Sequence, residues 1–318
     1  MSEQSTSPSG PAPSLAEVLG TVERLWPLHL QEPWDASGLV TGRPDQPVRR
    51  ILFAVDPVAD VVAEAVSTGT DLLLTHHPLL LRGVTSVAAD GFKGAVVHEL
   101  IEHRCALLAC HTNADSAPDG VSDAVARAAG LTTTTPLAPH PADPAVGIGR
   151  VGDLARPVPL RELARRLADA VPPTAHGVRV AGDPDALVRR VAVCGGAGDS
   201  LFDEVRAAGA DVYVTADLRH HPASEAREAA AGPGADGTPY LVDLSHFASE
   251  WLWLPVGAAA LREALAARGH DVEVAVSARR SDPWDFRIDH PGQDGSVHHG
   301  AAAEPATDPA APTAGGPA

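Results

Sequence analysis

The sequence predicts an α/β protein with two related halves. Short apolar runs of strand length alternate along the chain with amphipathic runs of helix length, and strand–helix–strand repetition implies parallel pairing with right-handed crossovers. One unit also recurs: Gly69-Thr-Asp-Leu-Leu-Leu-Thr75 is echoed by Gly209-Ala-Asp-Val-Tyr-Val-Thr215, each after an amphipathic helix. Two similar helix–strand units in one chain indicate duplication.

Length and composition narrow the class of protein. A chain of 318 residues can form two domains with sizeable cores. The formal net charge of −17 opposes phosphate backbones and anionic lipids, which argues against nucleic-acid and membrane partners. The three cysteines form no CxxC pair, and neither a signal-peptide pattern nor a membrane-length apolar run is present. We therefore expect a cytoplasmic protein in a reducing compartment.

Local signals place the individual elements. Ser14 and Glu17 form a capping-box pattern at the start of the first helix, and Pro27 closes it. The predicted helices are 14–25, 59–68, 91–104, 122–129, 159–170, a segment after 200, one opening at 246, and 258–268. The predicted strands are 50–55, 72–74, 106–109, 190–194, 240–243 and 272–276. We expect Gly69 to end helix 59–68 in the left-handed conformation, and the Pro-rich stretch 136–144 to mark a domain boundary.

A histidine pair follows the most apolar strand. Leu72–Leu74 reads as a strand buried on both faces, and His76-His77-Pro78 follows directly after Thr75. Ligands of open α/β sheets bind outside the carboxyl ends of strands, where these histidines lie. One histidine there would more often be a satisfied polar cap, but an adjacent pair favours a metal.

Two further strand exits carry ligand-type residues. One leads into His111 and Asp115, the other into His246 and Glu250. An Asx-turn before the next helix could explain the first group, and a surface ion pair the second. However, histidine and glutamate at i and i+4 share a helix face and can reach one centre.

The donor types restrict the metal. Nitrogen and oxygen ligands without thiolates suit zinc, manganese, iron, cobalt or nickel. Together with the pair at 76 and 77, the two exits supply five ligands, more than one open catalytic zinc takes. Five ligands match two cations that share a bridging carboxylate.

Two other stretches are weaker candidates for a functional role, and the C-terminal segment is expected to lack structure. A Trp34-Asp35 pair in a loop is most often a packing anchor beside a cap, which leaves Asp35 a weak functional candidate. Gly195–Ser200, between a strand and a helix, fits an anion-binding turn or simply a tight structural turn. Residues 285–318 have no apolar period and should be disordered.

Taken together, the motifs resemble the GTP cyclohydrolase I type 2 homologue family, also called the NGG-interacting-factor-3-like family. The resemblance covers roughly residues 14–284 and departs from the family at Ala216 and His220. The matching blocks are Trp34-Asp35…Gly38-Leu39, Thr75–Leu79, His111–Asp115, Gly147–Gly152, Cys194–Gly196, Thr215–Asp217 and His246–Glu250.

The resemblance implies a fold and an assembly. Two similar α/β domains are expected, with mainly parallel central sheets sandwiched by helices and the second domain inserted in the first. The first domain would comprise 14–137 plus 244–284 and the second 138–243, with disordered ends at 1–13 and 285–318. The resemblance also implies a toroidal homohexamer with dinuclear sites facing an internal cavity.

The family's metal ligands carry over onto the same five residues found from the sequence, namely His76, His77, Asp115, His246 and Glu250. Glu250 is expected to bridge both cations, with His77 and Asp115 completing one site and His76 and His246 the other.

The function that follows is a two-metal hydrolase acting on a small nucleotide-like substrate. His221 or His111 would shuttle protons. The family name suggests ring opening of GTP with release of formate. The alternatives are a hexameric metal-binding scaffold or regulator without turnover, and a nucleotide-binding protein built on Gly195–Ser200.

Overall fold

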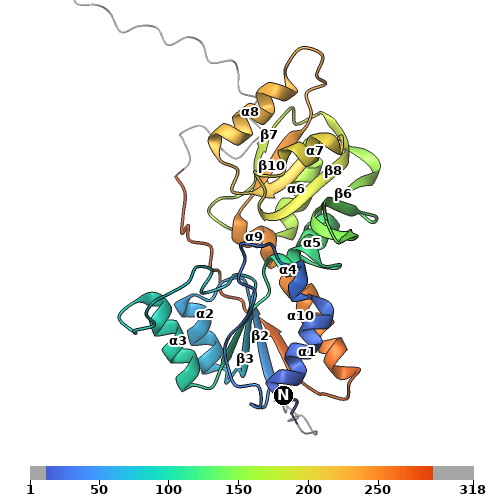
Figure 1. The fold of residues 1–318 in the computed structure, drawn as a ribbon. Helices are drawn as coiled ribbons and strands as arrows, with labels where there is room; N and C mark the ends of the chain where they lie inside the picture. The colour runs from blue at the N-terminus through green and yellow to red at the C-terminus, as the bar shows by residue number, and fades with distance from the viewer. Residues whose placement is uncertain (1–11, 289–318) are drawn as a thin grey trace, which may run out of the picture. The chain divides into compact units, whose positions relative to one another are not determined.

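The computed structural model describes residues 12–288, which form two mixed sheets with flanking helices (Figure 1). The chain up to Phe286 is one compact unit. The prediction of an α/β protein is confirmed.

The first sheet has five strands in the order β1-β4-β3-β2-β11. All of its pairings are parallel except that of β1 with β4. The strand bounds are β1 Gly38–Thr41, β2 Arg50–Ala54, β3 Leu72–Thr75, β4 Ala106–Ala109 and β11 Glu273–Val276.

Successive side chains of β3 enter two different cores. Leu72 and Leu74 pack into one core with Trp26 and Trp253, whereas Leu73 packs with Val61 into the other. Helices α1 and α10 cover the first face and α2 and α3 the second (Figure 1). All four residues of β3 are buried, so the strand is covered on both faces, as its sequence predicts.

The second sheet has six strands in the order β5-β6-β8-β9-β10-β7. Only β9 pairs in parallel on both sides, with β8 and β10, so this sheet is mixed and not mainly parallel as expected. Helices α5 and α6 pack on one face, and α7 and α8 on the other. The bounds are β5 Thr135–His140, β6 Asp143–Pro159, β7 Arg179–Ala181, β8 Leu187–Ala197, β9 Val212–Ala216 and β10 Tyr240–Leu244.

Part of the mixed pairing has its origin in the Pro-rich stretch 136–144, whereas the antiparallel pair of β7 with β10 lies elsewhere in the chain. The Pro-rich composition predicts a boundary, but the stretch forms the β5–β6 hairpin. Proline lacks an amide donor and reads as a strand breaker, yet an edge strand such as β5 tolerates it. The long strand β6 then pairs antiparallel with β8 as well.

The eight predicted helices are formed with local shifts, and the described chain has two further helices, α4 and α8, for which there was no prediction. Ser14 and Glu17 form the predicted capping box, and Gly69 has φ +65°. The last two helices meet at Leu252, so the second begins at Trp253 and not at 258 as predicted. The bounds are α1 Leu15–Leu25, α2 Ala59–Ser67, α3 Phe92–Glu102, α4 Thr112–Ser116, α5 Val121–Ala129, α6 Leu160–Ala170, α7 Phe202–Ala207, α8 His220–Ala230, α9 His246–Trp251 and α10 Trp253–Ala266, with a 3-10 turn at Leu28–Leu30.

Most of the two segments expected to be disordered, 1–13 and 285–318, lies outside the described residues. Pro13 is an exception, because its carbonyl accepts a hydrogen bond from Val48 N. The predicted domain limits stay a prediction, and they fall within β5 and β10. Within residues 12–288, no helix has the length and apolarity needed to cross a membrane.

Candidate metal centre

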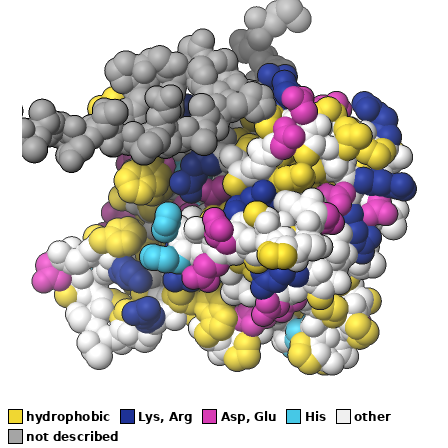
Figure 2. Space-filling model, turned by 90° about the horizontal axis from the view of Figure 1, so that it is seen from above, with side chains coloured by type: hydrophobic (Ala, Val, Ile, Leu, Met, Phe, Trp, Pro, Cys, Tyr) yellow, Lys and Arg dark blue, Asp and Glu magenta, His cyan; other side chains and the backbone are white. Residues whose placement is uncertain are grey.

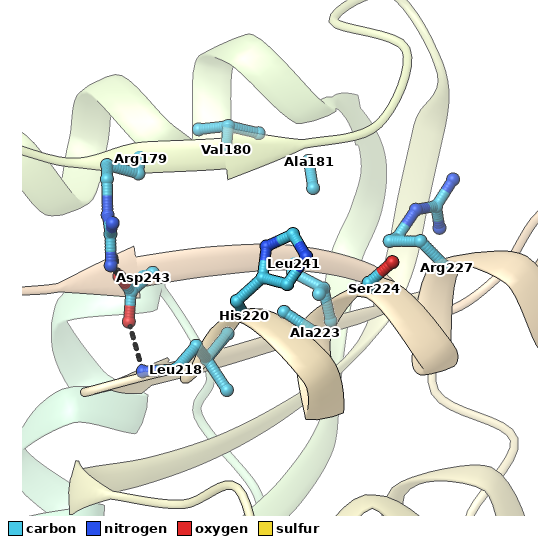
Figure 3. A pocket seen from close by; sticks show the side chains of 10 residues that line it. All are labelled: Arg179, Val180, Ala181, Leu218, His220, Ala223, Ser224, Arg227, Leu241 and Asp243. Carbon is cyan, nitrogen blue, oxygen red and sulfur yellow. Dashed lines mark hydrogen bonds and ion pairs between the residues drawn. The ribbon is translucent and has the colours of Figure 1, made fainter.

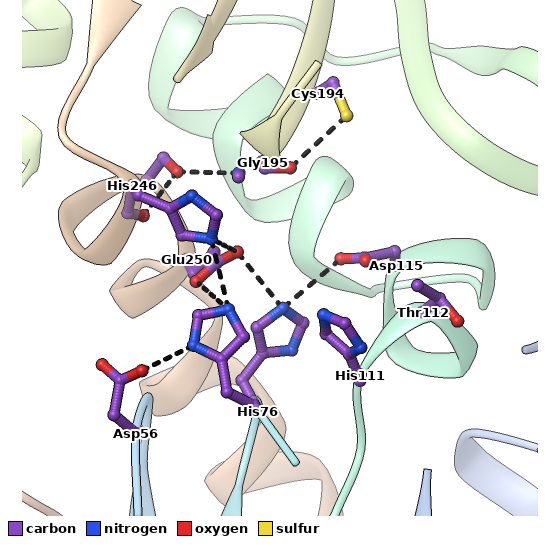
Figure 4. Close-up of polar contacts among 12 residues, drawn as sticks. Asp56, His76, His111, Thr112, Asp115, Cys194, Gly195, His246 and Glu250 are labelled. Carbon is purple, nitrogen blue, oxygen red and sulfur yellow. Dashed lines mark hydrogen bonds and ion pairs between the residues drawn. The ribbon is translucent and has the colours of Figure 1, made fainter. Parts of the chain in front are cut away.

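Three strand exits meet at one cluster of side chains (Figure 4). His76 and His77 follow β3, His111 and Asp115 follow its neighbour β4, and α9 after β10 contributes His246 and Glu250. The five ligands predicted from the sequence are therefore brought together, where the carboxyl ends of strands from the two sheets approach each other.

Glu250 lies at the centre of the cluster, with its side chain 3% exposed. Its Oε1 is 2.9 Å from His246 Nε2 and 3.4 Å from His76 Nε2, and its Oε2 is 3.1 Å from His77 Nε2. Asp115 Oδ1 is more distant, 3.8 Å from His76 Nε2. Each oxygen of Glu250 thus faces a different part of the imidazole set.

The ring of each histidine is held by a contact of its Nδ1 with an acceptor outside the cluster. His76 Nδ1 lies 2.9 Å from the Cys110 carbonyl oxygen. The other three Nδ1 atoms contact carboxylates: His77 with Asp56 at 2.6 Å, His111 with Asp35 at 2.7 Å and His246 with Asp217 at 2.8 Å. When Nδ1–H donates to such an acceptor, the Nε2 lone pair is left for a metal, as in metal-ligating histidines generally.

Three buried polar atoms of the cluster make no hydrogen bond with the described part of the chain, namely His76 Nε2, Asp115 Oδ1 and Glu250 Oε2. Burying a polar atom without a partner costs free energy, so such atoms usually mark a missing ligand or water. A cation among them would satisfy all three, and we conclude that the donor set fits a metal.

Electrostatics within the cluster couple its acids and bases. Burial lowers the pKa of His77, but the Glu250 and Asp56 carboxylates outweigh it and raise that pKa to about 10. Glu250 also raises the pKa of His246 to about 11. Burial raises the pKa of Glu250, yet the three neighbouring imidazoles hold it well below its usual range. Without metal, the imidazoles bind protons that a cation must displace.

Two subsets have ligand atoms close enough to hold an ion: His76 with His77 and His111, and His77 with His246 and Glu250. His111, expected to act as a proton shuttle, is therefore also a candidate ligand. The distances favour a different pairing from the predicted one, since His246 Nε2 lies 3.2 Å from His77 Nε2 and Asp115 lies nearest His76.

The Trp34-Asp35 loop has a different role from the packing anchor expected. Asp35 has a fully buried side chain that accepts hydrogen bonds from the Thr112 amide and hydroxyl as well as contacting His111. Burial alone would raise its pKa, but the bonds from His111 and Thr112 hold that pKa far below its usual range. Trp34, in contrast, is 59% exposed.

The sequence did not reveal every residue that shapes the cluster. Asp56 and Asp217 each follow a strand, where a lone aspartate usually signals a turn. Gly195 and Gly196 belong to β8, and α7 begins at Phe202 with Leu201 as its N-cap. An anion-binding role for Gly195–Ser200 stays a prediction. Gly196 has φ +68° and lies against Glu250.

His221, the other predicted proton shuttle, lies exposed on α8. Its neighbour His220 lines a separate cavity of about 410 Å³ beside β7 (Figure 3). The arginines there are engaged: Arg179 pairs with Asp243, and Arg227 donates to the Gly237 and Pro239 carbonyls. The catalytic role of His221 stays a prediction.

Comparisons with known proteins agree with the fold. The chain is 56% identical over 278 residues to a Streptomyces coelicolor protein named GTP cyclohydrolase 1 type 2 homolog, covering 87% of this chain and 95% of that one. A Mycobacterium tuberculosis protein of the same name is 36% identical, with 87% and 97% covered.

Solved structures of relatives are also similar. A Bacillus cereus protein related to NIF3 superposes with a TM-score of 0.78 at 24% identity, covering 87% of this chain and all of that one. A hypothetical protein of Staphylococcus aureus gives the same TM-score and coverage at 25% identity. Residues 13–283 match the Duf34/NIF3 (NGG1p interacting factor 3) family. With the fold, the strand-exit cluster and this match in agreement, the chain belongs to the Duf34/NIF3 family.

Proposed function

We propose that the cluster binds two divalent cations and that the protein is a metal-dependent hydrolase of a small nucleotide-like molecule. One observation carries the proposal. Three imidazoles, each with Nδ1 held by an outer acceptor, surround a buried carboxylate, and His111, held in the same way, lies beside two of them. Such outer acceptors are typical of metal-ligating histidines and orient the ring toward the ion.

The number of donors supports two cations. The two subsets that could hold an ion share only His77. Glu250 presents Oε1 toward His76 and His246 and Oε2 toward His77, which suits a carboxylate shared by two ions. Asp115 would complete one of the sites from the side of His76.

A bound pair of divalent cations supplies Lewis acidity, which lowers the pKa of water and stabilises negative charge on a substrate oxygen. The chain's own contribution is to hold the donors in place and to limit solvent access. Glu250 and His76 are buried, and Asp35, Asp56 and Asp217 fix the ring planes of the remaining histidines.

The name of the relatives, GTP cyclohydrolase 1 type 2 homolog, suggests a substrate class, a molecule with a nucleobase, and a reaction, ring opening of GTP. We extend only the substrate class to this chain. We also propose that the chain assembles as a toroidal homohexamer. Zinc, manganese, iron, cobalt and nickel all accept this mixed donor set.

The test combines metal analysis with turnover. We expect close to two equivalents of metal after gentle purification, and chelator-sensitive hydrolysis of at least one compound in a panel of nucleosides, GTP and phosphoesters that returns on adding metal. Glu250→Gln should abolish both, whereas Glu225→Gln, on the exposed surface of α8, serves as the matched control. One equivalent of metal would contradict the dinuclear site, and full metal content without turnover would favour a metal-binding scaffold.

A further inference from the structure

A cavity of about 400 Å³ opens beside the metal centre. Four candidate ligands line it, namely His111, Asp115, His246 and Glu250. These four come from both ends of the cluster, so a molecule in this cavity can reach either cation. The cavity is therefore the natural place for the reacting end of a substrate.

The charge of this cavity is unusual for a site that would hold a polyphosphate. No lysine or arginine of the described chain lines it, and Glu32 adds a further carboxylate. A second cavity on the other side of the cluster is lined by Asp56, Asp217 and Asp282, again without lysine or arginine from residues 12–288. Phosphate sites generally rely on arginine, lysine or free backbone amides.

Bound metals would not make the net charge of the site positive. Two divalent cations carry less charge than the two carboxylates of the cluster, Asp115 and Glu250, together with the three that hold its histidine rings, Asp35, Asp56 and Asp217. The Gly196 amide at the end of β8 adds no free donor, because it already donates to Ser249 Oγ at 2.9 Å.

An exposed aromatic ring completes the cavity. Trp34 is 59% exposed, and its ring centroid lies 5.8 Å from that of His111, nearly perpendicular to it. The loop that carries it is fixed, since Asp35 bonds to Thr112 and Ser37 N donates to Gln31 Oε1. Aromatic side chains in binding grooves provide platforms on which heteroaromatic bases stack.

We propose that the cavity beside Trp34 binds a flat, uncharged heteroaromatic ring, as in a purine nucleoside, and disfavours nucleoside triphosphates. The proposal rests on the proposed function for its metal centre and narrows the substrate class of that site. Three observations support it. The Trp34 indole is exposed, neither cavity is lined by lysine or arginine from the described residues, and the carboxylates around the site carry more charge than two bound divalent cations.

Equilibrium binding of guanosine, GMP and GTP to the manganese-loaded protein tests the proposal. We expect affinity to fall as phosphates are added, with guanosine at least about tenfold tighter than GTP. Metal content measured after each titration reveals any stripping by GTP. Affinity that rises from guanosine to GTP, or no guanosine binding at all, would overturn the proposal.

Variants of two exposed tryptophans test where the heteroaromatic ring binds. Trp34→Ala should weaken guanosine binding about tenfold or more with unchanged metal content, and Trp34→Phe should restore most of it. Trp284, 64% exposed at the second cavity, is the matched control, and Trp284→Ala should leave guanosine binding unchanged. Loss in Trp284→Ala but not in Trp34→Ala would contradict the assignment. Binding is measured apart from turnover, so guanosine that binds while no compound of the panel is hydrolysed favours the metal-binding scaffold and retains the ring site.

Discussion

Gly196 lies so close to Glu250 that a Cβ added to the glycine would be 2.5 Å from Glu250 Oε1. The same Cβ would be 3.4 Å from His246 Nε2. A strand of the second sheet thus presents bare backbone to the central carboxylate, and any side chain there would compete for the space around the ligands. The glycine is a steric requirement of the metal centre.

Gly196→Ala should therefore lose metal as well as stability. The left-handed φ of +68° costs an alanine about 1–2 kcal/mol, and the new methyl must also displace Glu250. Gly209→Ala separates the two effects, since Gly209 has φ +62° and a methyl group added there would meet no described atom within 4 Å. Metal analysis and melting temperature should show destabilisation in both variants but metal loss only at 196. Equal metal content in the two variants would contradict the close approach.

Glu250 and Asp115 should differ as ligands. Glu250→Gln keeps the size of the side chain but removes the charge beside three imidazoles, so we expect it to lose most of both cations. Asp115 approaches His76 at 3.8 Å, farther than any of the Glu250 contacts, so Asp115→Asn should mainly empty one site. The measurement is metal stoichiometry of the two purified variants. Similar retention in both would show that Glu250 is not the bridge.

Asp217, one of the carboxylates that hold the histidine rings, should strengthen metal binding. Asp217→Asn removes the charge that orients His246, and metal affinity should fall about 10- to 100-fold. Asp217 has φ +54°, which asparagine tolerates, so folding should be unaffected. Asp236→Asn, at an exposed turn where the carboxylate bonds to Thr238, is the control. Competition with a chromophoric chelator measures the metal affinity of both variants. An unchanged affinity in Asp217→Asn would exclude an orienting role.

The sequence revealed the candidate metal ligands more completely than their surroundings. His76 and His77 are adjacent at the end of a buried strand, so the signal is local and the parallel sheet brings the other exits to it. Asp56 and Asp217 lie in ordinary turn positions, and their role depends on which imidazole the fold brings near them. The antiparallel β6 was hidden by prolines whose tolerance depends on β5 being an edge strand.

The raised histidine pKa values predict how the metal-free protein responds to pH. His77 and His246 have folded pKa values of about 10 and about 11, against about 6.5 for an unfolded chain. A raised folded pKa means that the native state binds protons more tightly, so the stabilisation is fully present below about pH 6.5. It is lost as pH rises through 10 to 11. The melting temperature of chelator-treated protein should therefore fall steadily between pH 7 and pH 10.

Two comparisons make this prediction specific to the cluster. The metal-loaded protein should lack this decline, because cations replace the protons on the imidazoles. Metal-free Glu250→Gln should show a smaller decline, because the carboxylate that raises both pKa values is gone. Burial raises the pKa of the Cys105 thiol to about 12, so it does not titrate in this window. A metal-free melting temperature that rises with pH from 7 to 10 would show that the imidazoles are not protonated partners of Glu250.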